Sequence, residues 1–278
     1  MINKIVGKLR QVLSSTTHKE AINFALICHQ RSGSNMLSSI LNQHPKVDVF
    51  GQLFKDDENF QKKINAISPI PFKGNLFDDV IESRERFDEL EISPELREER
   101  NTDEFLDVFY KNYCQKTAFT RLGIKFHGGT LYQDELERNF FNATRKIIIL
   151  HRENLLAAAI SWYQARELNQ WMRRSNEKVE KQSISMDIDT LSWFIEKTKS
   201  DVALWKSLAK KDQKDILELT YEEITQSSFD LKRVWNYLEV SPLNQKKPQT
   251  KKLIKDYSHI PNLEEIKNTL ENDENGYL

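Results

Sequence analysis

A short apolar run that ends in a polar, glycine-containing turn constrains this chain more than any other feature. Residues 25–37 read ALICHQRSGSNML. The apolar run at residues 24–28 is too short for a helix and is typical of a strand that is buried on both faces. Beyond Gly33, apolar residues recur at the spacing of one helix face: Met36, Leu37, Ile40 and Leu41. Ser34 or Asn35 suits the start of this helix. The sequence therefore predicts a strand, a tight loop and a helix.

Such a unit is a ready-made anion site. It directs unpaired backbone N–H groups and the positive end of a helix dipole at one point. Gly33 allows the backbone to approach an anion closely. Arg31 and the hydroxyls of Ser32 and Ser34 add charge and hydrogen bonds. The expected ligand is a phosphate or a sulfate.

The loop lacks the parts of a nucleoside-triphosphatase loop. That motif needs two glycines followed by a lysine and a hydroxyl residue, and this loop has one glycine and no lysine. The run Gln-Arg-Ser-Gly-Ser-Asn at residues 30–35 instead resembles the 5′-phosphosulfate loop of sulfotransferases that use 3′-phosphoadenosine 5′-phosphosulfate (PAPS). The alternative is an ordinary strand-to-helix turn.

Composition narrows the class of protein. With 278 residues, 38% hydrophobic and 30% charged, the chain reads as a soluble globular protein. A net charge of −1 gives no support to a nucleic-acid partner. Two cysteines do not make a disulfide framework. No apolar run has the length of a membrane span. Residues 1–22 are typical of an amphipathic helix rather than of a signal peptide. We therefore expect a cytoplasmic protein without an integral membrane segment.

A second strand, predicted at residues 122–126, carries two polar side chains to its end. Ligands of open α/β sheets bind beyond the carboxyl ends of the strands, so Lys125 and His127 are expected near the anion loop. Alternation places both side chains on the same face. This Lys-x-His pattern resembles the cytosolic sulfotransferases, in which the lysine supports the transferring group and the histidine accepts the acceptor's proton. A structural histidine at a strand end is the alternative.

A third strand, predicted at residues 146–150, leads into a second anion motif. Arg152 follows this strand, and Ser161 lies in the predicted helix 155–166, roughly 10 Å along its axis. An arginine and a serine so placed can bracket one phosphate. The segment resembles the sulfotransferase motif that binds the 3′-phosphate of the nucleotide. Alternatively, the arginine caps the sheet edge and the serine fits a tight helix contact.

The flanking segments extend the resemblance. Ser-Trp-Tyr-Gln-Ala from Ser161 onwards is similar to bacterial, trehalose-sulfotransferase-like enzymes, as is the later order of a long helix, a strand at residues 216–219 and Tyr-Glu. In that type a proposed catalytic glutamate precedes an aromatic residue, where this chain has Gln52. An amide is no useful proton acceptor, so this role does not carry over. Lys251 and Lys252 match basic residues near the nucleotide, or else form a solvated face.

The resemblance implies one α/β domain over residues 1–278, with a central parallel sheet flanked by helices in a P-loop-like sulfotransferase fold. Residues 56–117 are expected to form a helical insertion over the acceptor side, or a solvated insertion. The implied donor is PAPS without a metal, and the acceptor is a hydroxyl of a carbohydrate, glycolipid or other small molecule. The implied catalytic residues are Arg31, Lys125 and His127. The implied donor-binding residues are Arg31, Ser32, Gly33, Ser34, Asn35, Arg152, Ser161, Lys251 and Lys252.

Two other classes share these features. A P-loop-type kinase or nucleotide hydrolase has the same strand, loop and helix, but it requires a divalent metal and the lysine that is missing here. A sulfotransferase homologue that binds the nucleotide without activity is the second alternative, and Gln52 is the residue that motivates it. The sequence leaves the acceptor and the oligomeric state open.

Overall fold

The fold is known from a computed structural model, which describes residues 22–50, 119–127, 144, 146–168, 183–243 and 257–270. Within these ranges the sheet has five strands in the order β2-β3-β1-β4-β5. Their bounds are β1 Ile22–Cys28, β2 Val47–Phe50, β3 Arg121–His127, β4 Lys146–His151 and β5 Asp215–Thr220. All four neighbouring pairs are parallel. This architecture is the predicted central parallel sheet of a P-loop-like α/β fold.

The register brings the carboxyl ends of four strands to one edge. Cys28, the last residue of β1, is paired with His127 on β3 and with Leu150 on β4. His151 of β4 is in turn paired with Thr220 at the end of β5. The loops that follow β1, β3, β4 and β5 therefore start side by side, which is where open α/β sheets bind their ligands.

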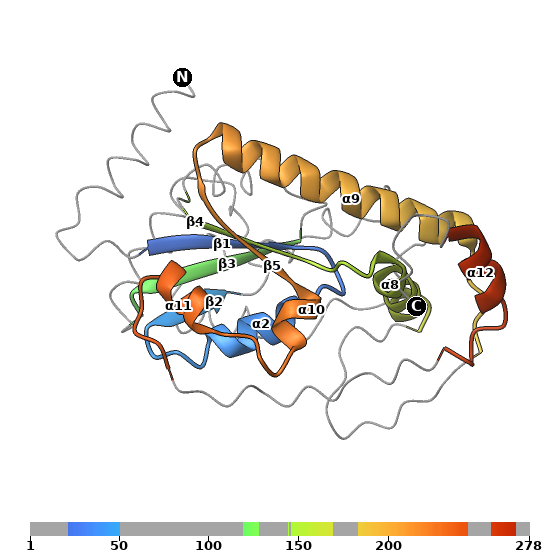
Figure 1. Ribbon diagram of the computed structural model, residues 1–278, viewed down its shortest axis with the longest axis horizontal. Helices are drawn as coiled ribbons and strands as arrows, with labels where there is room; N and C mark the ends of the chain where they lie inside the picture. Colours follow the sequence, from blue (N-terminus) through green and yellow to red (C-terminus); the bar gives the residue numbers. More distant parts are fainter. Residues whose placement is uncertain are drawn as a thin grey trace, which may run out of the picture.

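Helices cover both faces of the sheet (Figure 1). On one face lie α2 Ser34–Leu41, α10 Tyr221–Thr225 and α11 Lys232–Tyr237. The long helix α9 Ile188–Lys211 covers the other, and it contacts both α8 Leu155–Glu167 and the C-terminal α12 Leu263–Leu270. Because of this double cover, residues 147–150 of β4 are completely buried. Their apolar, β-branched composition is what a strand between two layers requires.

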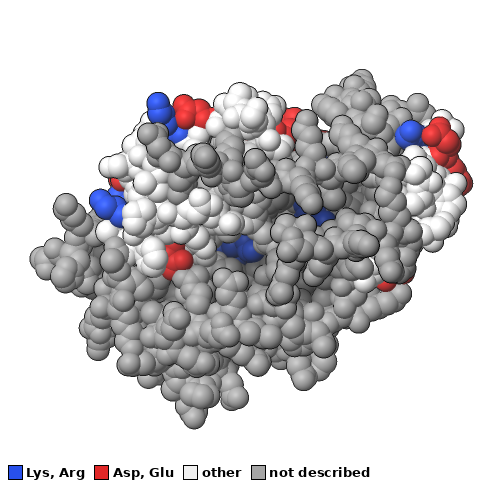
Figure 2. All heavy atoms as spheres, turned by 90° about the horizontal axis from the view of Figure 1, so that it is seen from below, with Lys and Arg blue, Asp and Glu red and all other residues white. Residues whose placement is uncertain are grey.

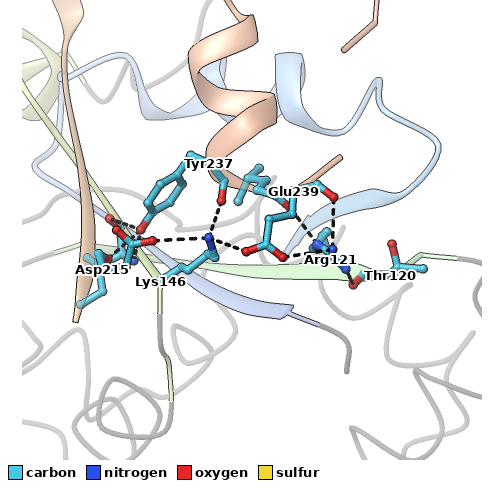
Figure 3. A network of polar contacts seen from close by, with 8 residues as sticks. Thr120, Arg121, Lys146, Asp215, Tyr237 and Glu239 are labelled. Carbon is cyan, nitrogen blue, oxygen red and sulfur yellow. Dashed lines mark hydrogen bonds and ion pairs between the residues drawn. The ribbon is translucent and has the colours of Figure 1, made fainter. Parts of the chain in front are cut away.

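A polar network closes the opposite, amino-terminal edge of the sheet (Figure 3). Lys146 Nζ donates to the carbonyl of Tyr237 at 2.6 Å and lies 3.0 Å from a carboxylate oxygen of Glu239. The Tyr237 hydroxyl accepts the N–H of Ile147 at 2.7 Å and lies 2.7 Å from the carbonyl of Asp215. Burial raises the pKa of Tyr237 well above its ordinary value. The network fixes α11 to the first residues of β4 and β5.

The strands and helices predicted within the described residues are confirmed, with ends that differ by one or two residues. One detail differs: the N-cap of α2 is Gly33, with φ of 84°, and among the described residues no side chain caps the start of this helix. The predicted helix at 1–22 lies outside the described residues except for Ile22, which begins β1. The insertion 56–117 lies wholly outside them. Among the described helices, none is long and apolar enough to cross a membrane.

Candidate functional site

The loop after β1 has an unusual backbone. The Ser32 hydroxyl donates to the carbonyl of His29 at 2.7 Å and closes the turn. Arg31 and Gly33 both adopt left-handed conformations, with φ of 65° and 84°. This conformation costs a non-glycine residue roughly 1–2 kcal/mol, and such strain gathers at functional sites. Because the N-cap residue Gly33 has no side chain to cap α2, a bound anion can interact with the first N–H groups of the helix.

Gly33 is required by packing as well as by backbone conformation. A Cβ atom at this position would lie 2.7 Å from Cδ2 of the Tyr221 ring. Real Cβ atoms do not approach so closely, so any side chain would displace the tyrosine or the loop. The loop after β1 and the start of α10 are therefore in direct contact.

Two hydrogen bonds join the loop to α8. Arg31 Nε donates to the Ser161 hydroxyl at 2.9 Å, and Trp162 Nε1 donates to the side-chain oxygen of Gln30 at 2.8 Å. Arg31 belongs to the predicted 5′ motif and Ser161 to the predicted 3′ motif. The sequence predicted that both motifs serve one ligand, but it gave no sign that they touch.

Lys125 and His127 reach the same edge from β3. Lys125 is 4% exposed, and its Nζ donates to Oδ1 of Asn35 at 2.7 Å. His127 is partly exposed at the end of the strand, where it is paired with Cys28. The structure thus brings Lys125 to the first turn of α2 and His127 to the strand end beside the loop.

Arg152 leaves the end of β4 and lies over the ring of Tyr221, with its guanidinium carbon 4.6 Å from the ring centroid. Its Nε atom is 3.7 Å from a carboxylate oxygen of Glu222. The Asn154 side chain caps α8 by accepting the N–H of Ala157 at 2.7 Å. Arg152 and Ser161 therefore sit on one strand-turn-helix unit, as predicted.

His29 is a residue of the site that the sequence reasoning missed. Its ring lies on Trp205 at 4.7 Å between centroids, and Nε2 is 3.7 Å from a carboxylate oxygen of Asp201. That carboxylate is bonded to Lys197 at 2.9 Å. Burial, with a smaller effect from the Lys197 charge, lowers the pKa of His29 to about 3. A neutral ring therefore anchors the loop to α9. In the sequence, this role is indicated by the position of His29 directly after the predicted strand and at the start of the loop.

The C-terminal segment packs beside the second motif. Tyr257 packs against the apolar cluster of α8 and α9, and burial raises its pKa while the charge of Arg152 opposes that rise. His259 contacts the side chain of Gln164 on α8. The predicted nucleotide-binding Lys251 and Lys252 lie outside the described residues, as does Gln52.

Basic side-chain atoms are visible in recessed positions near the middle of the face in Figure 2. Most of the acidic atoms seen in this view lie nearer its edges. Among the residues with a described structure, no group of three or more His, Cys, Asp or Glu side chains is arranged to hold a metal ion. The side chains at this edge of the sheet that carry or can carry positive charge include Arg31, Lys125, His127 and Arg152.

Comparison with known proteins gives a family match for most of the chain. A sequence profile described as Sulfotransferase family matches residues 24–241, which is most of the chain. A comparison with curated proteins finds no match. Among solved structures, the sulfotransferase domain of the Synechococcus PCC 7002 olefin synthase is similar, with 16% identity, a TM-score of 0.44, and 83% of this chain and 78% of that chain covered. The sulfotransferase domain from the curacin biosynthetic pathway has 13% identity, a TM-score of 0.43, and coverage of 80% and 75%.

Proposed function

The chain belongs to the sulfotransferase family, and on this premise we propose that it transfers a sulfuryl group from PAPS to a hydroxyl of a carbohydrate, glycolipid or other small acceptor. The observation that carries the donor assignment is the 2.9 Å hydrogen bond from Arg31 to Ser161. A donor with phosphate groups at both its 5′ and 3′ positions needs two anion sites within the span of one nucleotide. Two motifs in direct contact meet that requirement.

The proposed donor lies across the carboxyl ends of the strands. Its 5′-phosphosulfate is bound by residues 31–35, where Arg31 and Lys125 supply positive charge. Its 3′-phosphate is bound by Arg152 and Ser161. The contact of Lys125 with Asn35 supports this arrangement, because it holds a buried ammonium group at the first turn of α2.

The proposed reaction is an in-line displacement at sulfur. The acceptor oxygen forms the new S–O bond, while the bond between sulfur and the bridging phosphate oxygen breaks and adenosine 3′,5′-bisphosphate leaves. His127 accepts the hydroxyl proton, and Arg31 and Lys125 stabilise the charge that develops on the leaving phosphate. As in phosphoryl transfer, most of the rate enhancement comes from positioning and electrostatics.

Thermal stabilisation by nucleotides tests the donor assignment. Adenosine 3′,5′-bisphosphate should raise the melting temperature without added metal, because a ligand that binds only the folded state stabilises it. ATP with Mg²⁺ should raise it much less, since ATP lacks the 3′-phosphate. Equal stabilisation by the two nucleotides would contradict the proposal and favour the phosphate-loop kinase class.

A further inference from the structure

We propose that Glu222 is a positioning residue for the 3′-phosphate of the nucleotide, acting through Arg152. This inference rests on the proposed function and extends it to a side chain that does not itself bind the ligand. Glu222 lies on α10 and Arg152 follows β4, so they meet only because β4 and β5 are neighbours in the sheet.

The Glu222 carboxylate holds the turn that carries Arg152. One oxygen accepts the N–H of Glu153 at 3.0 Å, and the other accepts the N–H of Asn154 at 3.3 Å. These are the two residues directly after Arg152. Since the side chain of Asn154 is already used to cap α8, it is the Glu222 side chain that holds the backbone at this point. The direction in which Arg152 leaves the backbone therefore depends on Glu222.

Glu222 also attracts the guanidinium group of Arg152 without accepting a hydrogen bond from its Nε. Arg152 Nε lies 3.7 Å from the nearer carboxylate oxygen, which is within range for charge attraction but too long for a hydrogen bond. This buried Nε has no hydrogen-bond partner among the described residues. The Tyr221 ring supports the guanidinium carbon at 4.6 Å. Arg152 is thus oriented from two sides without a hydrogen bond from its Nε to Glu222.

The neighbouring Glu223 has a different task and provides a matched control. Its backbone N–H donates to the Thr220 hydroxyl at 3.1 Å, and its carboxylate accepts the N–H of Thr220 at 2.9 Å, which forms a capping box at the start of α10. Glu223 also lies 3.5 Å from Arg233 on α11. The two adjacent glutamates of α10 therefore have different roles. Glu223 caps the helix, whereas Glu222 contacts Arg152 and the turn that follows it.

The experiment compares the affinities for adenosine 3′,5′-bisphosphate and adenosine 5′-phosphate. Wild-type protein should prefer the bisphosphate. Glu222→Ala should lower that preference roughly tenfold and leave the affinity for the monophosphate nearly unchanged, because only the contact to the 3′-phosphate is lost. Arg152→Ala should lower the preference at least as much, about ten- to a hundredfold, and the double variant should lose no more than Arg152→Ala alone. Glu223→Ala should lower the melting temperature but keep the wild-type preference.

Two results would overturn the role of Glu222 while leaving the donor assignment intact. One is an unchanged preference in Glu222→Ala, and the other is an equal loss of affinity for both nucleotides, as a general structural defect would produce. If Glu222→Ala does not fold, the nucleotide preference is measured with Glu222→Gln instead. The glutamine amide has one oxygen in place of the two carboxylate oxygens that accept the N–H groups, and it carries no charge. Glu222→Gln should also show a reduced preference. A wild-type protein without any preference would instead contradict the proposed 3′-phosphate site itself.

Discussion

His127 is the side chain on which the proposed chemistry depends most. It ends β3 beside the anion loop, two residues beyond the buried Lys125 and on the same face of the strand. We predict that His127→Ala leaves binding of the bisphosphate nearly intact and lowers turnover by at least about a hundredfold, the lower range of effects for loss of a general base. The measurement is a steady-state sulfuryl-transfer assay together with nucleotide titration.

Gln52→Glu provides the control for this prediction. It restores the carboxylate of the trehalose-type enzymes at a position outside the described residues, and it should recover some turnover in the His127→Ala background if the acceptor binds there. Near-normal turnover of His127→Ala by itself would show that the base lies elsewhere.

At the level of single residues, the sequence predicted positions better than contacts. Arg31, Lys125 and Arg152 could be assigned to one edge because each follows or ends a recognisable buried strand. The bond between Arg31 and Ser161 could not be predicted, since the two are 130 residues apart and meet through packing of α8. The burial of His29 against Trp205 depends in the same way on where α9 crosses the sheet.

At the level of secondary structure, β1 and β4 could be predicted because parallel strands with two covered faces are continuous apolar runs. The role of α11 could not be predicted. The apolar residues Leu231, Val234, Trp235 and Leu238 recur at helical spacing, but this spacing does not show that the Tyr237 hydroxyl contacts the backbones of β4 and β5. The order of the strands was also beyond the sequence, because it depends on how each connection crosses the sheet.

We predict that Tyr237→Phe destabilises the protein without affecting the ligand site. The substitution removes the partner of the partly buried Ile147 N–H and of the exposed Asp215 carbonyl, and an unsatisfied buried donor costs about 1–3 kcal/mol. The length of β4 separates this network from Arg152. Urea denaturation should show the lower free energy of unfolding, with an unchanged dissociation constant for the bisphosphate. A weaker dissociation constant would contradict the separation of the two edges.

At the scale of the whole molecule, the predicted parallel sheet with helices on both faces is confirmed. A single domain over residues 1–278, the trehalose-type subtype and the acceptor-side insertion remain predictions.

The burial of His29 makes the free energy of unfolding of the protein depend on pH in the acid range. Its pKa of about 3 in the folded protein lies below the ordinary value of 6.5 that applies to the unfolded chain. Between these values the unfolded state binds the extra proton, so the free energy of unfolding falls as pH falls below about 6.5.

At pH 5 the loss due to His29 alone should be roughly 2 kcal/mol relative to neutral pH. Carboxylates with lowered pKa values, such as Glu218 and Glu239, add to the loss as the pH falls through their own range. Comparison with His29→Gln isolates the histidine contribution, because this variant has no titrating ring. Its unfolding free energy should change less between pH 7 and pH 5 than that of the wild type, and parallel curves would contradict a buried neutral His29.

The central claim is that the two anion motifs form one nucleotide site, and a calorimetric titration with adenosine 3′,5′-bisphosphate in metal-free buffer tests it most directly. We predict one bisphosphate bound per chain. Arg152→Ala should weaken this binding about ten- to a hundredfold, because a charge-assisted contact is worth about 1.5–3 kcal/mol. Ser161→Ala should act in the same direction but less. Two independent binding events, or an unchanged affinity in folded Arg152→Ala, would contradict the claim.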